Sequence, residues 1–462
     1  MTKPQIVWLR RDLRMADQPA LYAAAQAGPV IPVYVLDDDA AGSHAYGGAS
    51  RWWMHHSLDS LSKSLGARHS RLILRCGDTV EELTKIVEET GAEVIHAIRH
   101  YEPWWRKAQG KLSDAFDLQL YDGNYLLPPG AVTTGSGTPY KIYTPFSKAT
   151  LEQMPPRDVL PEPETLSHPD SWPKSDALDD WNLLPTRPDW SGGIDAFWQV
   201  GEAAAQDRLA EWEGDVAEYD DARNLPSQDG SSRLSPHLHF GEISPAQVWH
   251  ALKGRRGKGW DVYGKELIWR DYAQNVICQF PAYPTQSYRE DFEKLKWRDP
   301  KTDADAAADL KAWQKGKTGY PVVDAGMRQL WQTGWMHNRV RMIAASFLIK
   351  HLLIDWRHGE QWFWDTLVDA DYAQNGTNWQ WVAGTGVDSN MFVRIMAPLS
   401  QSEKFDAAGY ISEYVPELAQ LDAPYIHDPE EHGCLPDGYP AKIIGHREAR
   451  ERALDTYKAI KQ

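Results

Sequence analysis

The sequence predicts an α/β domain with a parallel sheet, followed by a long linker and a larger all-α domain. Three observations support this. Strand-like and helix-like stretches alternate near the start, Pro, Asp, Ser and Trp dominate from about Gly130 to Gly193, and helical periodicity prevails from about Ile194. We therefore place the α/β domain at residues 1–130, the interdomain linker at 131–193 and the all-α domain at 194–462.

The first domain is expected to be Rossmann-like, with helices on both faces of its sheet. Apolar strands are predicted at Ile6–Leu9, Val30–Leu36, Arg71–Leu74 and Glu93–Ile98, with helices at Ala49–Leu65, Thr79–Glu89 and Pro103–Ala115. No GxGxxG follows the first strand, so ordinary dinucleotide binding is not supported there.

Composition excludes several classes of protein. The net charge of −16 argues against nucleic-acid binding by bulk charge, although a local basic patch stays possible. The three Cys are far apart and suggest neither a disulfide framework nor a metal site. The N-terminal residues lack the apolar core of a signal peptide, and the longest apolar run, Met342–Ile354, is too short to span a bilayer. We expect a cytoplasmic protein with no membrane partner.

The run from Gly334 to Trp381 carries the strongest functional signal. It places two Asn, two Arg, two Asp and several Trp along helix-like apolar stretches. Charges this close to buried aromatic surface need partners, because desolvating an unpaired charge is costly. Such a density suggests a large, planar ligand with polar edges held inside helices, and a flavin fits that description.

Other motifs allow two interpretations each. SSRLSPHLHFGEISP (Ser231–Pro245) suits a pyrophosphate or an ordinary helix N-cap. KELIWRDYAQN (Lys265–Asn275) puts Glu266, Trp269 and Arg270 on one helix face, as a surface ion pair or a binding wall.

The remaining motifs are weaker signals. GKTG (Gly316–Gly319) lacks the earlier Gly of a phosphate loop and is better interpreted as a turn before a helix. The Asp369–Asp371 pair either caps a helix or binds a cofactor, and any single Trp is more often core. No zinc-deaminase or hydrolase motif occurs.

Ordered motifs over nearly the whole chain resemble the cryptochrome/photolyase family, and most closely its bacterial cyclobutane pyrimidine dimer (CPD) photolyases, with features of classes I and III. They run from VWLRRDLRMADQPAL through SSRLSPHL, KELIWRDY, GKTGYPVVDAGMRQL and GWMHNRVRMIAASF to NWQW, EKFD and HREARERAL. The resemblance implies light-dependent repair of UV-damaged DNA by a monomer, with an electron passing from photoexcited reduced FAD to a flipped-out dimer.

The resemblance also implies a folded FAD in the helical domain. Asp369 would pair with Arg341 beside the flavin ring, Asp371 would meet the ribose or adenine side, and Asn375 would face flavin N5. The full set of implied cofactor-binding residues is Tyr219, Ser231, Ser232, Arg233, Leu234, Ser235, Arg270, Asn338, Arg341, Asp369, Asp371 and Asn375.

Two further sets follow from the resemblance. The lesion pocket would contain Glu266, Trp269, Asn338, Met342 and Trp381, with Arg339 and Arg394 against the DNA backbone. Trp379, Trp356 and Trp297 would form the chain that reduces oxidised flavin in light.

An antenna chromophore is also expected in the α/β domain, near HYEPWW (His100–Trp105) and GGASRWWMHH (Gly47–His56). Methenyltetrahydrofolate is favoured by a class III-like middle region, with a deazaflavin or FMN as alternatives.

Ser402 replaces a Gly of the family's usual pattern beside the lesion pocket. A cryptochrome-type photoreceptor and a (6-4) photoproduct lyase are the rival interpretations. A long C-terminal extension would indicate a cryptochrome, whereas the chain ends soon after the predicted Arg447–Lys458 helix. A (6-4) lyase would need a pocket His, and the corresponding helix contains His337 but reads MHN as in CPD enzymes.

Overall fold

The structure is a computed structural model that describes residues 2–254, 257–389 and 391–461. The chain forms two compact units. The first comprises Met1–Ala217, Ser232–Pro281 and Val368–Asp371, and the second Glu218–Ser231, Ala282–Leu367 and Tyr372–Gln462. A compact unit is a set of residues rich in mutual contacts and need not coincide with a domain, so the boundaries at 130 and 193 stay predictions.

The first unit contains a five-stranded parallel sheet in the order β3-β2-β1-β4-β5. The strands are β1 Gln5–Leu9, β2 Val30–Leu36, β3 Ile73–Cys76, β4 Val94–Ile98 and β5 Asp117–Tyr121. The predicted parallel sheet is confirmed, with β3 shifted two residues toward the C-terminus. Strand β5 was not predicted, because this edge strand is half exposed and lacks a continuous apolar run.

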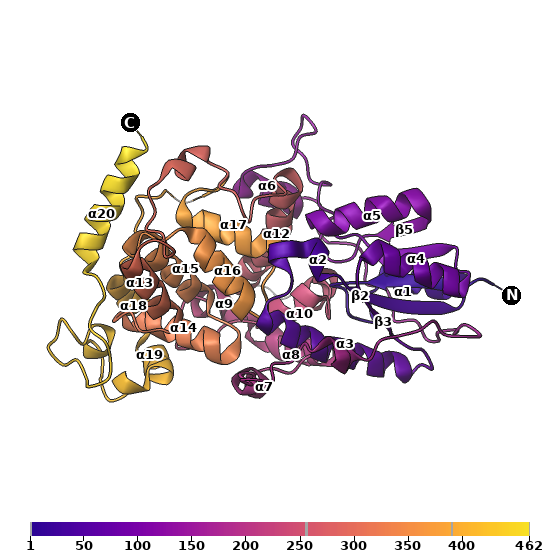
Figure 1. Cartoon of the computed structure of the whole chain (residues 1–462), viewed down its shortest axis with the longest axis horizontal. Helices are drawn as coiled ribbons and strands as arrows, with labels where there is room; N and C mark the ends of the chain where they lie inside the picture. The colour runs from indigo at the N-terminus through magenta and orange to yellow at the C-terminus, as the bar shows by residue number, and fades with distance from the viewer. Residues whose placement is uncertain (1, 255–256, 390, 462) are drawn as a thin grey trace. The chain divides into compact units, whose positions relative to one another are not determined.

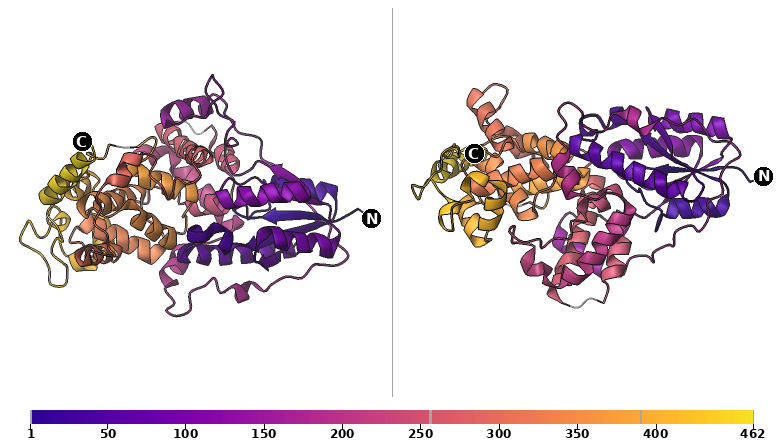
Figure 2. Two further views of the ribbon diagram at one scale, coloured as in Figure 1. Left: turned by 45° about the horizontal axis from the view of Figure 1, so that its top comes forward. Right: turned by 90° about the horizontal axis from the view of Figure 1, so that it is seen from below.

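Residues of the central strand β1 alternate between two apolar cores. Val7 and Leu9 join the core that contains buried residues of α1 and α3, whereas Ile6 and Trp8 join the core that contains those of α4 and α5. The helices are α1 Pro19–Ala27, α3 Gly48–Gly66, α4 Thr79–Thr90 and α5 Pro103–Ala115. Figures 1 and 2 show helices on both sides of the sheet, as predicted.

The irregular segment after the sheet is fastened to the same unit by its aromatic residues. Trp181 and Trp190 pack against the core of α1 and α3, and Trp172 packs against the other core. The unit's other helices are α2 Asp38–Ala41, α6 Tyr143–Leu151, α7 Gly192–Phe197, α8 Glu202–Asp215, α10 Ser235–Phe240, α11 Pro245–Leu252 and α12 Lys258–Gln279. Short 3₁₀ turns span Gly42–His44 (η1), Leu178–Trp181 (η2) and Val216–Glu218 (η3).

In its described residues the second unit is helical, as predicted. Its helices are α9 Tyr219–Ala222, α13 Ala304–Gln314, α14 Pro321–Thr333, α15 Asn338–Ser346, α16 Trp356–Thr366, α17 Tyr372–Ala383, α18 Pro398–Lys404, α19 Ala408–Tyr414 and α20 His446–Ala459. A π-helical turn, η5 Phe347–His351, follows α15, and 3₁₀ turns span Glu290–Lys294 (η4), Pro416–Leu418 (η6) and Tyr425–His427 (η7). Among the residues described, no helix is both long and apolar enough to cross a bilayer.

Candidate functional site

The Ser231–Pro245 motif contains one short helix, α10, and ends on the first residue of α11. Arg233 adopts a left-handed φ of +52°, with its guanidinium 4.5 Å from the centroid of the Phe197 ring. The N-cap of α10 is Leu234, which makes no side-chain capping bond, whereas Ser244 caps α11 through a capping box with Gln247. The N-cap interpretation therefore applies to the second Ser-Pro step and not to the first.

The two predicted aspartates lie on the segment Val368–Asp371, which belongs to the unit of the sheet. The Ser235 hydroxyl donates to Asp369 Oδ2 across 2.7 Å, which joins two predicted cofactor residues. Asp371 Oδ2 accepts from Arg11 Nη1 at 2.6 Å and lies 3.4 Å from His239 Nδ1. Burial alone would raise the pKa of Asp371, but the Arg11 guanidinium, the hydrogen bond with His239 and the charge of Arg270 together outweigh burial and hold that pKa well below its usual range.

Helix α12 presents the second predicted set. The Trp269 ring stacks on Tyr143, with centroids 3.4 Å apart and planes within 5°. Arg270 donates to the backbone carbonyls of Asn124 and Leu238, so it binds neighbouring backbone in addition to any contact with Glu266. Trp269 and Glu266 are half-buried, which leaves part of each side chain accessible.

Asn375 lies on α17 of the second unit and is held by α16. Its side-chain Nδ2 donates to the Glu360 backbone carbonyl at 3.0 Å and to Glu360 Oε1 at 2.9 Å. Glu360 is buried, so this amide group has a fixed orientation. Arg341, on α15, donates from Nε to the Met336 carbonyl at 2.7 Å. Arg341 and Asp369 belong to different units, and their pairing stays a prediction.

Tyr219 and Ser231, the first two predicted cofactor residues, lie at the two ends of the same stretch of the second unit. Tyr219 begins α9 with its ring 5.3 Å from the Arg223 guanidinium, and Ser231 occupies a bend.

The three predicted relay tryptophans differ in their surroundings. Trp356 begins α16 and is fully buried, and its indole N–H has no hydrogen-bond partner among the described residues. Trp379, on α17, packs edge-on against Phe363 with centroids 5.0 Å apart. A Cβ at Gly359 would lie 2.1 Å from the Trp379 ring, so only glycine allows this approach of α16 to α17. Trp297 is half-buried in a loop.

The predicted DNA-facing residues of the second unit are accessible. Asn338 and Arg394 are exposed, and Met342 and Trp381 are half-buried. Arg339 donates to Asn224 Oδ1 at 2.6 Å and its guanidinium lies 4.5 Å from the Phe405 ring centroid. The Arg394 carbonyl accepts from the buried Lys350 amine at 2.9 Å.

His337 caps the N-terminus of α15, where its Nδ1 accepts from the Arg339 N–H at 3.2 Å. Burial, with Arg339 and Arg341 nearby, lowers the pKa of His337 to about 4. This imidazole is therefore neutral at pH 7.

The sheet unit contains a cavity of about 580 Å³ beside the HYEPWW segment. Its walls include Arg99, His100, Tyr101, Arg106, Gln109 and Cys278. By contrast, the tryptophans of GGASRWWMHH pack in the core, where Trp52 donates to Asp195 and Trp53 to Glu242. Of the two segments expected near an antenna, HYEPWW contributes its own residues to this cavity.

Two other sequence interpretations can be compared with the structure. Gly316 and Gly319 have left-handed φ angles of +60° and +78° directly before α14, which confirms the turn. Ser402 lies buried in α18, where its hydroxyl contacts His427 Nδ1 at 2.7 Å. The hydroxyl that replaces the family's glycine is thus hydrogen-bonded inside the unit.

Comparisons with known proteins agree with this architecture. Residues 5–165 match the family model described as DNA photolyase, and residues 263–459 match the FAD binding domain of DNA photolyase. The chain is 45% identical to a deoxyribodipyrimidine photo-lyase of Agrobacterium fabrum, over 100% of this chain and 99% of that one. The chain belongs to the cryptochrome/photolyase family.

Other members of the family show how far the likeness extends. A crystal structure of a bacterial class III photolyase from Agrobacterium tumefaciens superimposes with a TM-score of 0.93 and 44% identity, covering 100% of this chain and 98% of the other. Cryptochrome-1 of Arabidopsis thaliana is 34% identical over 97% of this chain but only 69% of its own length. The predicted fold, a parallel-sheet photolyase domain and a helical FAD-binding domain, is confirmed.

Sequence reasoning missed the residues that hold the predicted ones. Arg11 and His239 contact Asp371, and Glu360 orients Asn375. One signal was present, because RRDLR puts three Arg beside one Asp directly after a buried strand. Such an excess of charge at a strand end requires distant carboxylate partners.

Proposed function

We propose that this protein is a light-dependent DNA repair enzyme, a deoxyribodipyrimidine photo-lyase that splits cyclobutane pyrimidine dimers. The observation that carries the proposal is the 45% identity, over essentially the full length of both chains, to the Agrobacterium photo-lyase. UV-damaged DNA is the substrate, and the enzyme acts as a monomer without a membrane.

FAD is the catalytic cofactor. The residues proposed to hold it are Tyr219, Ser231, Ser232, Arg233, Leu234, Ser235, Arg270, Asn338, Arg341, Asp369, Asp371 and Asn375. Hydroxyls, guanidinium groups and a neutral amide suit a pyrophosphate, a ribose and a flavin edge. When bound in its reduced form, the cofactor would supply, on excitation by blue light, the electron that opens the cyclobutane ring.

Asn375 contributes a neutral group at flavin N5. Because Asn375 Nδ2 donates to both the backbone carbonyl and the carboxylate of Glu360, the amide's oxygen and nitrogen are not interchangeable. An oriented amide polarises its neighbour without adding a full negative charge next to it. This favours an anionic reduced flavin.

The lesion is bound by stacking and hydrogen bonding. Trp269 and Trp381 flank the flipped bases, while Glu266 and Asn338 bind base edges and Met342 fills the pocket. Tyr143 covers one face of Trp269, which fixes the plane of the indole for a base on its other face. The Arg339 and Arg394 guanidinium groups bind DNA phosphates.

Trp379, Trp356 and Trp297 carry electrons from the surface to oxidised flavin. The order of burial supports this, since Trp356 and Trp379 are buried and Trp297 is half-buried. A relay needs rigid rings at fixed spacing, and the close approach at Gly359 provides this for Trp379.

The cavity beside His100 and Tyr101 is proposed to hold the antenna chromophore. Methenyltetrahydrofolate is favoured over a deazaflavin or FMN, because the middle region resembles class III enzymes and the Agrobacterium class III structure is so similar. The Arg99 and Arg106 side chains on its wall suit a carboxylate-bearing ligand.

The two rivals make different predictions. A (6-4) lyase is disfavoured because His337 is a neutral helix cap, and protonating the lesion would require an imidazolium. A photoreceptor of the cryptochrome type would bind FAD and photoreduce it without repairing DNA.

The test uses two oligonucleotides, one with a single thymine cyclobutane dimer and one with a (6-4) photoproduct. Each is incubated with photoreduced protein in blue light and in darkness, and restored thymines are counted by chromatography. Light-dependent restoration of the cyclobutane dimer alone is expected. Restoration of the (6-4) product alone supports the first rival, and photoreduction with no repair of either supports the second.

A further inference from the structure

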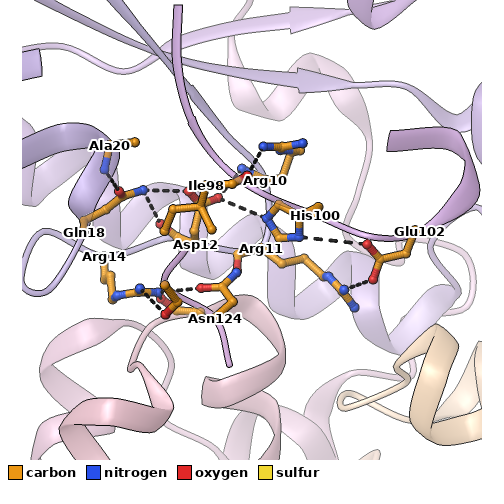
Figure 3. Close-up of polar contacts among 12 residues, drawn as sticks. Arg10, Arg11, Asp12, Arg14, Gln18, Ala20, Ile98, His100, Glu102 and Asn124 are labelled. Carbon is orange, nitrogen blue, oxygen red and sulfur yellow. Dashed lines mark hydrogen bonds and ion pairs between the residues drawn. The ribbon is translucent and has the colours of Figure 1, made fainter. Parts of the chain in front are cut away.

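A buried charged network occupies the carboxyl end of β1. Arg10, Arg11 and Asp12 follow the strand directly, and none is more than 5% exposed. Figure 3 shows them beside His100 and Glu102, which follow β4. β1 and β4 are neighbouring strands at the point where the strand order reverses, the usual place for a ligand in an open α/β sheet. Here the protein's own ion pairs occupy that place.

Arg11 bridges two carboxylates within this network. Its Nη2 donates to Glu102 (Figure 3), and its Nη1 donates to Asp371 Oδ2 at 2.6 Å. The Arg11, Glu102 and Asp371 side chains are 6%, 1% and 9% exposed. The two ion pairs of Arg11 are therefore almost wholly removed from water. In such surroundings charge pairs interact most strongly, and their geometry matters most.

The Arg11–Asp371 ion pair holds one end of a four-residue segment, Val368–Asp371. Val368–Asp371 belongs to the sheet unit, although Leu367 and Tyr372 on either side belong to the second unit. Val368 is fully buried in the same core as Val7 and Leu9. The segment is thus anchored to the sheet at one end by an apolar side chain and at the other by the Arg11 ion pair.

The same segment carries two of the proposed flavin residues, Asp369 and Asp371. Asp369 also receives the Ser235 hydroxyl bond at 2.7 Å. We propose that Arg11, acting through Asp371, is a positioning residue for the flavin site. Its ion pair fixes the positions of Asp369 and Asp371 relative to the sheet. This inference rests on the proposed binding of FAD by Asp369 and Asp371.

Arg14 provides a matched control within the same network. It is buried, like Arg11, but donates to the backbone carbonyls of Asp17, Gly123 and Gly241 and to Asn124 Oδ1. Those bonds join the loop after β1 to the segments at Gly123 and Gly241, and none of them is to Val368–Asp371. A purely structural role predicts similar consequences for Arg11→Gln and Arg14→Gln, whereas a positioning role predicts different ones.

The experiment measures FAD content, the rate of FAD loss after dilution, and urea unfolding for full-length wild type, Arg11→Gln, Arg14→Gln and Arg11→Lys. We expect Arg11→Gln to lose FAD at least tenfold faster than Arg14→Gln when each variant is measured at a urea concentration equally far below its own unfolding midpoint. Arg11→Lys keeps the charge but lacks the planar guanidinium, whose two Nη atoms each donate to one carboxylate, so its rate should lie between those of wild type and Arg11→Gln.

A pH series separates positioning from general loosening. The charged and titratable groups facing Asp371 are Arg11, Arg270, His239 and Tyr125, and burial lowers the pKa of the His239 imidazole. Without the Arg11 guanidinium, burial raises the pKa of Asp371, so acid-induced FAD loss should begin at a higher pH in Arg11→Gln than in wild type. In Arg14→Gln the onset should stay at the wild-type pH.

Equal FAD loss and an equal acid onset in Arg11→Gln and Arg14→Gln would overturn the inference. If Arg11→Gln does not fold, the same comparison is made between Arg11→Lys and Arg14→Lys. Wild-type protein that binds no FAD would instead contradict the proposed function, so the two failures are distinguishable.

Discussion

The Asn375 side-chain amide donates to the buried Glu360 carboxylate across 2.9 Å and to the Glu360 carbonyl across 3.0 Å. The two residues lie on neighbouring helices, α17 and α16, so the contact fixes both the position and the rotation of the amide. A carboxylate that accepts from one side of an amide determines what the other side can offer a ligand. The effect of a charge at position 375 on the reduced flavin can therefore be tested.

Replacing Asn375 by Asp should disfavour an anionic reduced flavin. The change replaces the amide that donates to Glu360 by a second acidic group, so that negative charge is added at the position proposed to face flavin N5. We expect faster reoxidation of the reduced flavin in air, followed by its absorption spectrum. Asn378→Asp is the control, because Asn378 is exposed one turn further along α17 and should leave reoxidation unchanged.

Replacing Gly359 by Ala should displace Trp379. The new Cβ would meet the indole at 2.1 Å, and overpacking of this kind costs about 1–3 kcal/mol. We expect a lower unfolding midpoint in urea together with slower photoreduction of oxidised flavin. Gly214→Ala, at an exposed position of α8 with open space around it, should stabilise by about 0.5–1 kcal/mol and leave photoreduction intact.

Replacing Trp356 by Phe should separate electron relay from folding. The Trp356 indole N–H makes no hydrogen bond among the described residues, so Phe sacrifices volume without losing a bond. We expect photoreduction to slow at least tenfold while the chemically reduced enzyme repairs dimers at the wild-type rate. Loss of repair by the chemically reduced variant would place Trp356 in the repair step itself.

Acid should destabilise the protein partly through His337. Its pKa is about 4 when folded and about 6.5 when unfolded, so the unfolded chain binds more protons between these values. The stability contributed by neutral His337 is present above about pH 6.5 and is lost as pH falls toward 4, which amounts to about 3 kcal/mol. Urea unfolding of His337→Asn should lack this share of the pH dependence, because Asn keeps an N-cap acceptor without titrating. Identical pH dependence in both proteins would contradict the assignment.

The sheet was predictable where strands are buried and apolar. β1 after Gln5 and the whole of β2 are continuous hydrophobic runs, and β4 is interrupted only by His96, because both faces of a parallel sheet are covered. β5 carries Asp117 and Gln119 at an exposed edge and gave no such run. Its place in the sheet comes from pairing with β4, which no local pattern reveals.

The candidate site was predictable where motifs carry its residues, and not where tertiary contacts complete it. The partners of Asp371 and Asn375 are Arg11, some 360 positions away in sequence, and Glu360, one helix earlier. An isolated sequence shows that buried charges need partners but does not say which ones are near. The contacts that orient these site residues were therefore visible only in the fold.

The most direct test of the proposed function is a count of turnovers. Protein with chemically reduced flavin is mixed with an excess of an oligonucleotide that contains one thymine dimer, and restored thymines per flavin are counted after blue light. We predict many dimers repaired per flavin in light and none in darkness. A fully reduced, DNA-bound protein that repairs no dimer in light would contradict the claim that this protein is a photolyase.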